Sequence, residues 1–118
     1  MEKKTTTRSN CIVSDEVIAT IACAAAREVE GVTNMATRPN DLKKILSSGA
    51  ERSVSVDNRE STLALDVYIE IAEGAKIQDV AEKVQQNVKS AVQGMVGKPV
   101  TRVNVHIAGL AAEDKAAQ

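Results

Sequence analysis

The chain has 118 residues and a formal net charge of −1, which fits a single domain and argues against a strongly basic surface for nucleic acid. Hydrophobic residues make up 43% of the chain but aromatic residues only 1%, so Val, Ile, Leu and Ala must build the core. Two cysteines are too few for a secreted disulfide scaffold and indicate a reducing cytosol. No apolar run reaches the ~20 residues that span a bilayer, so we expect no direct membrane insertion.

The order of polar and apolar segments predicts one domain with two flexible ends. Residues 1–10 are polar and mildly basic and lack the apolar run of a signal peptide, so we expect a flexible arm. The folded domain is predicted over residues 11–110. Residues 111–118 are expected to form a flexible tail.

The first predicted helix runs over residues 15–29. Ser14 is a favourable N-cap, and Gly31 provides a left-handed C-terminal stop. At 100° per residue, its core face is expected to contain Val17, Ile18, Ile21, Ala25 and Val29.

Three small side chains, Ala19, Cys23 and Ala26, fall opposite that predicted core face. One interpretation is a smooth strip where another helix or a second protomer docks. The other is that Ala is the best helix former and Cys a small tolerated residue. The sequence leaves both open.

The link over residues 32–50 has the weakest pattern in the chain. A short helix is predicted over residues 41–46, after Pro39 and before Gly49. Its apolar side chains would cover one end of the core.

Strict alternation of apolar and polar residues predicts a strand over residues 63–72. Residues 53–56 alternate in the same way, and the polar link at 57–60 predicts a hairpin between the two segments. An amphipathic pattern predicts a long helix over 77–95. Its core face is expected to contain Ile77, Val80, Ala81, Val84, Val88, Ala91, Val92 and Met95. A final strand follows around residues 102–107.

The predicted fold is a single small α+β domain with the order helix, short helix, β-hairpin, long helix and β-strand. The last strand–helix–strand unit should be a right-handed crossover, which makes its two strands parallel. Because the strands are apolar on one side only, we expect the helices on one face of a small mixed sheet. The other sheet face is then open.

The open face is predicted to carry Ser53, Ser55, Asp66, Tyr68, Glu70, Arg102, Asn104 and His106. Tyr68 is the chain's single aromatic residue, and aromatic and Arg side chains are frequent anchors at interfaces. The face is therefore either a partner-binding surface or a plain hydrated sheet face.

No pattern in the sequence indicates catalysis, a cofactor or a metal. His106 is the single histidine, so a polar surface position explains it better than a general base or a ligand. Asp66 and Glu70 share a strand face but lie roughly 13 Å apart, too far for a paired-carboxylate site. The glycines at 94 and 97 match the GxxG of an RNA-clamping loop, but helix termination explains them better. We therefore predict that the chain is not an enzyme.

Several segments together resemble the alkaline-shock-protein family, the small general-stress and envelope-stress proteins of Gram-positive bacteria. The segments are VSDEVIATIA at 13–22, AAREVEGV at 25–32, LDVYI at 65–69, IQDVAEKVQQNVK at 77–89 and VNVHIAG at 103–109. They cover nearly the whole chain in the family's order. Two features depart from the family pattern: Cys23 stands where Gly is expected, and the 32–50 link lacks a Gly-rich lead into the hairpin.

The resemblance implies a cytoplasmic protein without catalytic residues that serves cell-envelope homeostasis. For some members it also implies self-association and recruitment to the inner face of the membrane by a small membrane-anchored partner. Other members resemble regulators of fatty-acid or lipid-metabolism enzymes, and this alternative stays open. A third reading, RNA binding through Lys3, Lys4, Arg8 and the open face, would require salt-sensitive retention of RNA.

Overall fold

The computed structural model describes residues 12–38 and 49–111. The elements in order are α1 (Asp15–Arg27), β2 (Val32–Met35), the 3-10 helix η2 (Gly49–Arg52), β3 (Val54–Asn58), β4 (Leu63–Ala72), α3 (Ile77–Val96) and β5 (Val100–Ala111). The predicted arm at 1–10, the short helix at 41–46 and residues 112–118 of the predicted tail lie outside the described residues. Ala111, which was predicted to begin the tail, is the last residue of β5.

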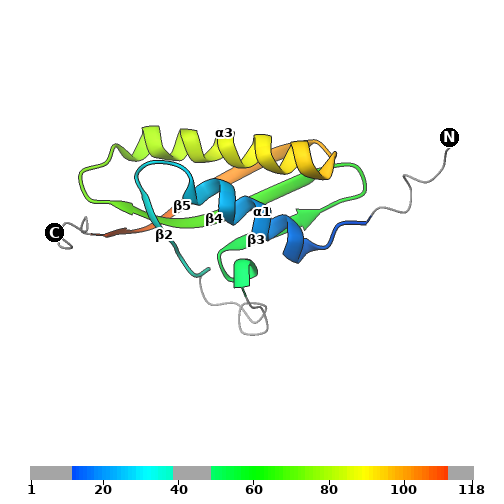
Figure 1. The fold of residues 1–118 in the computed structure, drawn as a ribbon, viewed down its shortest axis with the longest axis horizontal. Helices are drawn as coiled ribbons and strands as arrows, with labels where there is room; N and C mark the ends of the chain where they lie inside the picture. Colours follow the sequence, from blue (N-terminus) through cyan, green and yellow to red (C-terminus); the bar gives the residue numbers. More distant parts are fainter. Residues whose placement is uncertain (1–11, 39–48, 112–118) are drawn as a thin grey trace.

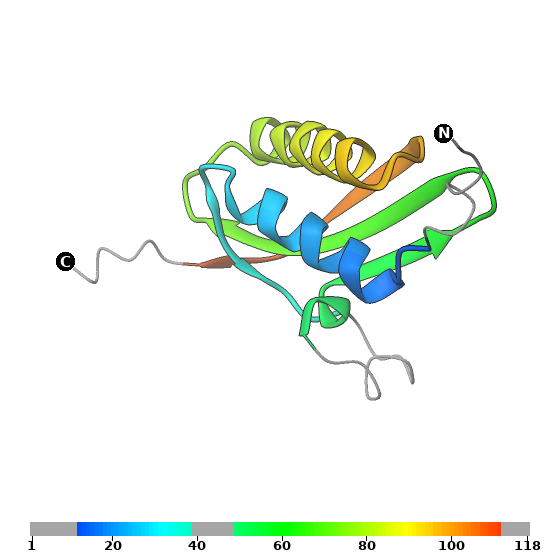
Figure 2. The same ribbon diagram turned by 45° about the vertical axis from the view of Figure 1, so that its right-hand side comes forward.

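The strands form a four-stranded mixed sheet around β4. β5 pairs with β4 in parallel along its whole length, while β2 and β3 pair with it antiparallel. Since β5 occupies one edge of β4, β2 and β3 share the other edge, one after the other. Both helices lie over the same face of this sheet (Figures 1 and 2). The α+β fold, the hairpin and the parallel last strand are therefore confirmed.

The core lies between the helices and the sheet. Alternate residues of β4 face it, and each is 0% exposed: Leu63, Leu65, Val67, Ile69 and Ile71. The period-two pattern of this strand predicted that face correctly. The intervening residues of β4 through Glu70 are half-buried and form the middle of the open face.

Helix α3 is held to the sheet by one narrow stripe of valines. Val80, Val84, Val88 and Val92 are buried at every fourth position. Valine is a weak helix former, so this packing provides the stability that propensity does not. The ends of the predicted core face are wrong: Ile77 is 48% exposed and Met95 72% exposed.

Helix α1 begins as predicted, because the Ser14 hydroxyl accepts a hydrogen bond from the Val17 amide at 3.2 Å. It ends at Arg27, two residues earlier than expected. Gly31 then turns the chain toward β2 with a φ of 104°. A Cβ atom at this glycine would lie 2.8 Å from Cγ2 of Val80, so the turn also packs closely on α3.

The buried side of α1 differs from the prediction. Ala19 and Ala26 are 0% exposed and Cys23 is 6% exposed, whereas Val17 is 49% exposed. The buried arc is rotated by about one residue, ~100°, from the predicted one. The cause is η2, where Ala50 packs on the core and its carbonyl oxygen lies 3.8 Å from Cys23 Sγ. The predicted docking strip is therefore interior, and that prediction is wrong.

Strand β2 was not predicted. Its residues Val32–Met35 pair with the last third of β4, opposite Ile69 to Ile71, with one register shift. The strand has only four residues and an exposed middle, so it carries no clear alternation. Its place at the sheet edge comes from the pairing partner rather than from its own pattern.

Candidate functional site: the open-face cluster

Four side chains on the exposed side of the sheet form one connected group, here named the open-face cluster: Asp66, Tyr68, Asn104 and His106. The parallel pairing of β4 and β5 places Asp66 opposite Asn104 and Tyr68 opposite His106. Directly opposed residues on one sheet face have side chains within contact distance. The register therefore brings together residues that are about 40 positions apart in the sequence.

Asp66 is the centre of the hydrogen bonding in the cluster. Its Oδ1 accepts a hydrogen bond from Asn104 Nδ2 at 3.0 Å. The same oxygen lies 3.0 Å from His106 Nε2, which donates when that nitrogen carries a proton. These contacts fix the direction of the imidazole ring on the sheet surface.

The two rings of the cluster are stacked. The centroids of Tyr68 and His106 lie 4.3 Å apart and their planes differ by 8°. Asp66 on one side and Tyr68 on the other therefore hold His106 in a single orientation. The result is a flat, preorganised surface with aromatic, amide and carboxylate groups.

The electrostatics of the cluster keep Asp66 ionised. Partial burial raises the pKa of its carboxyl. Hydrogen bonds from His106 and Asn104 and the nearby positive charge of Arg102 lower this pKa by more than burial raises it. The net effect is a pKa below the usual value for Asp. The side chains of His106 and Asp66 are still 42% and 38% exposed, so a partner can reach them.

Glu70 and Arg102 extend the predicted surface on either side of the cluster. Glu70 lies on the same face of β4, with its Cγ 3.6 Å from where a Cβ of Gly109 would stand. Arg102 is exposed and pairs with Ala64. All six predicted site residues thus share the open face. Ser53 departs from the prediction because it is only 8% exposed.

The contacts within the cluster were not predicted. Asp66 and His106 were considered separately, and Asp66 was compared only with Glu70. The parallel register of β4 and β5 was the missing signal, because it decides which residues of two strands stand opposite each other.

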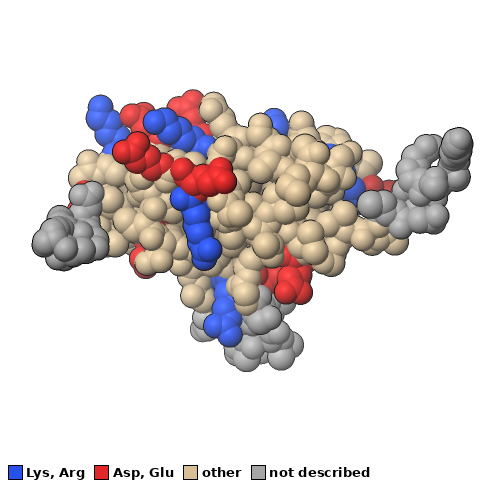
Figure 3. Space-filling view, viewed as in Figure 1, with Lys and Arg blue, Asp and Glu red and all other residues tan. Residues whose placement is uncertain are grey.

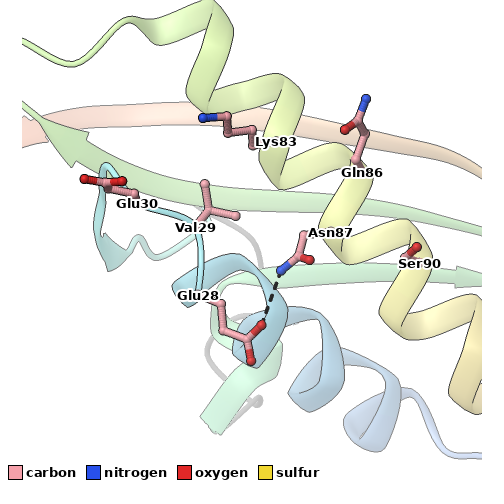
Figure 4. A pocket seen from close by; sticks show the side chains of 7 residues that line it. All are labelled: Glu28, Val29, Glu30, Lys83, Gln86, Asn87 and Ser90. Carbon is pink, nitrogen blue, oxygen red and sulfur yellow. Dashed lines mark hydrogen bonds between the residues drawn. The ribbon is translucent and has the colours of Figure 1, made fainter.

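On the opposite side of the molecule, the helical face has two hollows between α1 and α3. One is polar and holds Asn87, whose Nδ2 donates to the Ala25 carbonyl at 2.7 Å and lies 3.5 Å from Glu28 Oε1 (Figure 4). The other is largely apolar and includes Ile21 and the exposed Met95. In Figure 3 charged side chains gather where α3 begins, while the surface over α1 and the second half of α3 is mostly uncharged.

Other site classes find no support in residues 12–38 and 49–111. No group of three or more potential metal ligands occurs there. Within the same ranges, no helix has the length and hydropathy required to cross a membrane. Fold and site together define a small α+β domain with an exposed, preorganised polar and aromatic sheet face.

The comparisons assign this domain to a family. A model of the alkaline shock protein 23 family, described as having a cell envelope-related function, matches residues 3–112. The chain belongs to this family, which confirms the resemblance seen in the sequence.

Two relatives from Bacillus subtilis (strain 168) carry the names uncharacterized protein YloU and uncharacterized protein YqhY. YloU is 34% identical over 103 residues, which cover 83% of this chain and 85% of the relative. YqhY is 32% identical over 108 residues, which cover 88% of this chain and 78% of the relative.

Among solved structures, a variant of the MamM CTD has a similar fold. The TM-score is 0.51 at 15% sequence identity, and the match covers 85% of this chain and 99% of that one. At this identity the similarity concerns the fold alone.

Proposed function

We propose that the chain is a non-enzymatic docking protein of the cell envelope that binds a protein partner through the open-face cluster. The observation that carries this proposal is the stack of Tyr68, the chain's single aromatic residue, on His106. Aromatic side chains that are held rigid before binding lose little conformational entropy when a partner covers them. The family's cell envelope-related function supports the setting.

The same geometry favours recognition over catalysis. The Nε2 atom of His106 is occupied by Asp66, and both side chains are about 40% open to water. A general base normally works where water is excluded and its free nitrogen faces the substrate. The cluster offers a flat surface, and a flat surface with hydrogen-bonding groups suits a protein partner.

We place this docking at the cytoplasmic side of the membrane, through a small membrane-anchored protein. The described residues supply no membrane-crossing helix of their own, so attachment through a partner fits the envelope setting. The partner's segment is expected to present an aromatic or basic side chain, which matches the exposed Tyr68 ring and the Asp66 carboxylate.

The test is an affinity purification from native lysate that contains membranes. Wild-type protein is compared with a Tyr68→Ala, Arg102→Ala variant and with a Met95→Ser variant, which changes an exposed residue of the helical face. Circular dichroism first establishes that all three are folded. Recovery of a small membrane protein by wild type and Met95→Ser, and its loss with the open-face variant, is the expected result.

Other results decide against parts of the proposal. Recovery of a lipid-metabolism enzyme in the same pattern would replace the membrane anchor with a regulatory role at the same surface. Equal recovery by all three baits would refute the open-face docking site.

A further inference from the structure

The two edges of the sheet are built very differently. One edge consists of β2 and β3, which have four and five residues and end before they can offer a long template. The other edge is β5, with twelve residues in one continuous strand. Short edge strands protect a sheet from pairing with other chains, and a long edge strand does not.

The backbone of β5 has unpaired groups that point away from β4. The Tyr68 amide donates to the Ser53 carbonyl on the β3 side of β4. Backbone groups alternate in direction along a strand, so those of Val67 and Ile69 point toward β5. In the parallel register, His106 then directs its backbone groups toward β4. By alternation, the N–H and C=O groups of Val105 and Ile107 point outward.

In the described residues, the hydrogen bonds from α3 to β5 lie near the start of this edge. Gln93 Oε1 accepts a hydrogen bond from the Val100 amide at 3.0 Å, and Gln85 Nε2 donates to the Val103 carbonyl at 3.0 Å. Within the described part of the chain, β5 pairs with no strand other than β4, and no hydrogen bond reaches the outward groups of Val105 and Ile107.

Outward backbone groups that alternate along an extended strand fit one kind of ligand, another extended strand. A second copy of β5 fits without electrostatic conflict, because residues 103–111 contain no Lys, Arg, Asp or Glu. In antiparallel pairing this neutral stretch faces itself, so no like charges stand opposite each other. Charged residues that normally guard an edge strand are absent from this stretch.

We propose that two copies of the chain pair antiparallel through β5, with Val105 of each copy opposite Ile107 of the other. This register joins both pairs of free outward groups and leaves the Gln85 contact with Val103 intact. A register shifted in one direction would require the Val103 carbonyl, which already accepts from Gln85. A register shifted in the other direction would require residues beyond the pairing irregularity that follows Ile107. In the proposed register, His106 stands directly opposite His106 of the second copy.

The pairing has a consequence for the open face. It would join the two sheets into one continuous sheet, with both helical layers on one side and both open-face clusters on the other. The two Tyr68–His106 stacks would then meet at the twofold axis. This inference is independent of the proposed docking function, and either can fail without the other.

The test uses a single new cysteine on β5. His106→Cys in a Cys11→Ser background places two thiols opposite each other, at a non-hydrogen-bonded pair whose Cα atoms lie about 4.5 Å apart. Disulfides form at such separations. Asn104→Cys is the matched control, because the register puts it four residues out of alignment with its own copy, roughly 13 Å away. Both positions are half-buried on the same face.

Mild oxidation of folded His106→Cys should give a disulfide-linked product of twice the 12.5 kDa chain mass, while Asn104→Cys stays monomeric. Equal cross-linking of both variants, or none of His106→Cys, would overturn the proposed pairing. Wild-type sedimentation supplies a second measurement that needs no cysteine. A rise toward twice the chain mass with concentration is expected, and a monomer at millimolar concentration would overturn the proposal.

Discussion

Gly31 is the position where one added methyl group tests the packing of the turn most sharply. Its φ of 104° is one that residues with a Cβ rarely adopt, and the added Cβ would lie 2.8 Å from Val80 Cγ2. The backbone conformation costs about 1–2 kcal/mol for alanine. Overpacking against a buried valine adds about 1–3 kcal/mol. Gly31→Ala is therefore expected to lower the free energy of unfolding by about 2–5 kcal/mol.

Gly74→Ala separates the two effects, because Gly74 has a similar φ of 92° but no atom within 4 Å of an added Cβ. It should show the backbone cost alone, about 1–2 kcal/mol. Urea unfolding followed by circular dichroism measures all variants. In a Val80→Ala background the extra cost at Gly31 should shrink toward that of Gly74. Equal losses for the two glycine variants in the wild-type background would refute the close contact between the turn and α3.

Three further predictions concern single side chains. Asn87→Ala should lower the free energy of unfolding by about 1–2 kcal/mol in urea titrations, because it frees a carbonyl at the end of α1, while the exposed Gln86→Ala should change it by less than about 0.5 kcal/mol. The lowered pKa of Asp66 contributes stability above the unfolded pKa of about 3.9, and this contribution is lost as the pH falls through the folded pKa. Asp66→Asn should therefore lose less stability on acidification than wild type, and identical acid profiles would contradict the hydrogen bonding. Burial raises the pKa of the Cys23 thiol despite the opposing charge of Arg27, so its contribution is present below the unfolded pKa of about 8.5 and is lost as the pH rises through the folded pKa. In a Cys11→Ser background, labelling by a thiol reagent at pH 8 should follow unfolding, and fast labelling of the folded protein would disprove the burial.

The strands and the long helix could be predicted because their side chains differ sharply in polarity. Leu63 to Ile71 alternate with polar or small residues, and the valines of α3 recur at every fourth position. Those periods follow directly from backbone geometry. The register between β4 and β5 does not follow from either strand alone. The open face was therefore predictable, but the hydrogen bonds within the cluster were not.

The orientation of α1 could not be predicted for a related reason. Alanine occurs on both sides of the helix, since Ala19, Ala22 and Ala26 are buried whereas Ala24 is exposed, so the small apolar residues did not mark the buried side. Small side chains let α1 approach η2 closely, and that contact decided which side is buried. Cys23 was consequently assigned to the surface although it lies in the core.

The central claim, docking of a partner on the open-face cluster, is tested most directly by site-specific photo-cross-linking in native membranes. A photoreactive phenylalanine analogue at position 68 reports on the open face, and the same analogue at position 95 reports on the helical face, where Met95 is 72% exposed. We expect one small membrane protein to be cross-linked from position 68, not from position 95, with the product lost when Arg102→Ala is added. Products from position 95 alone, or none from position 68, would contradict the proposed function.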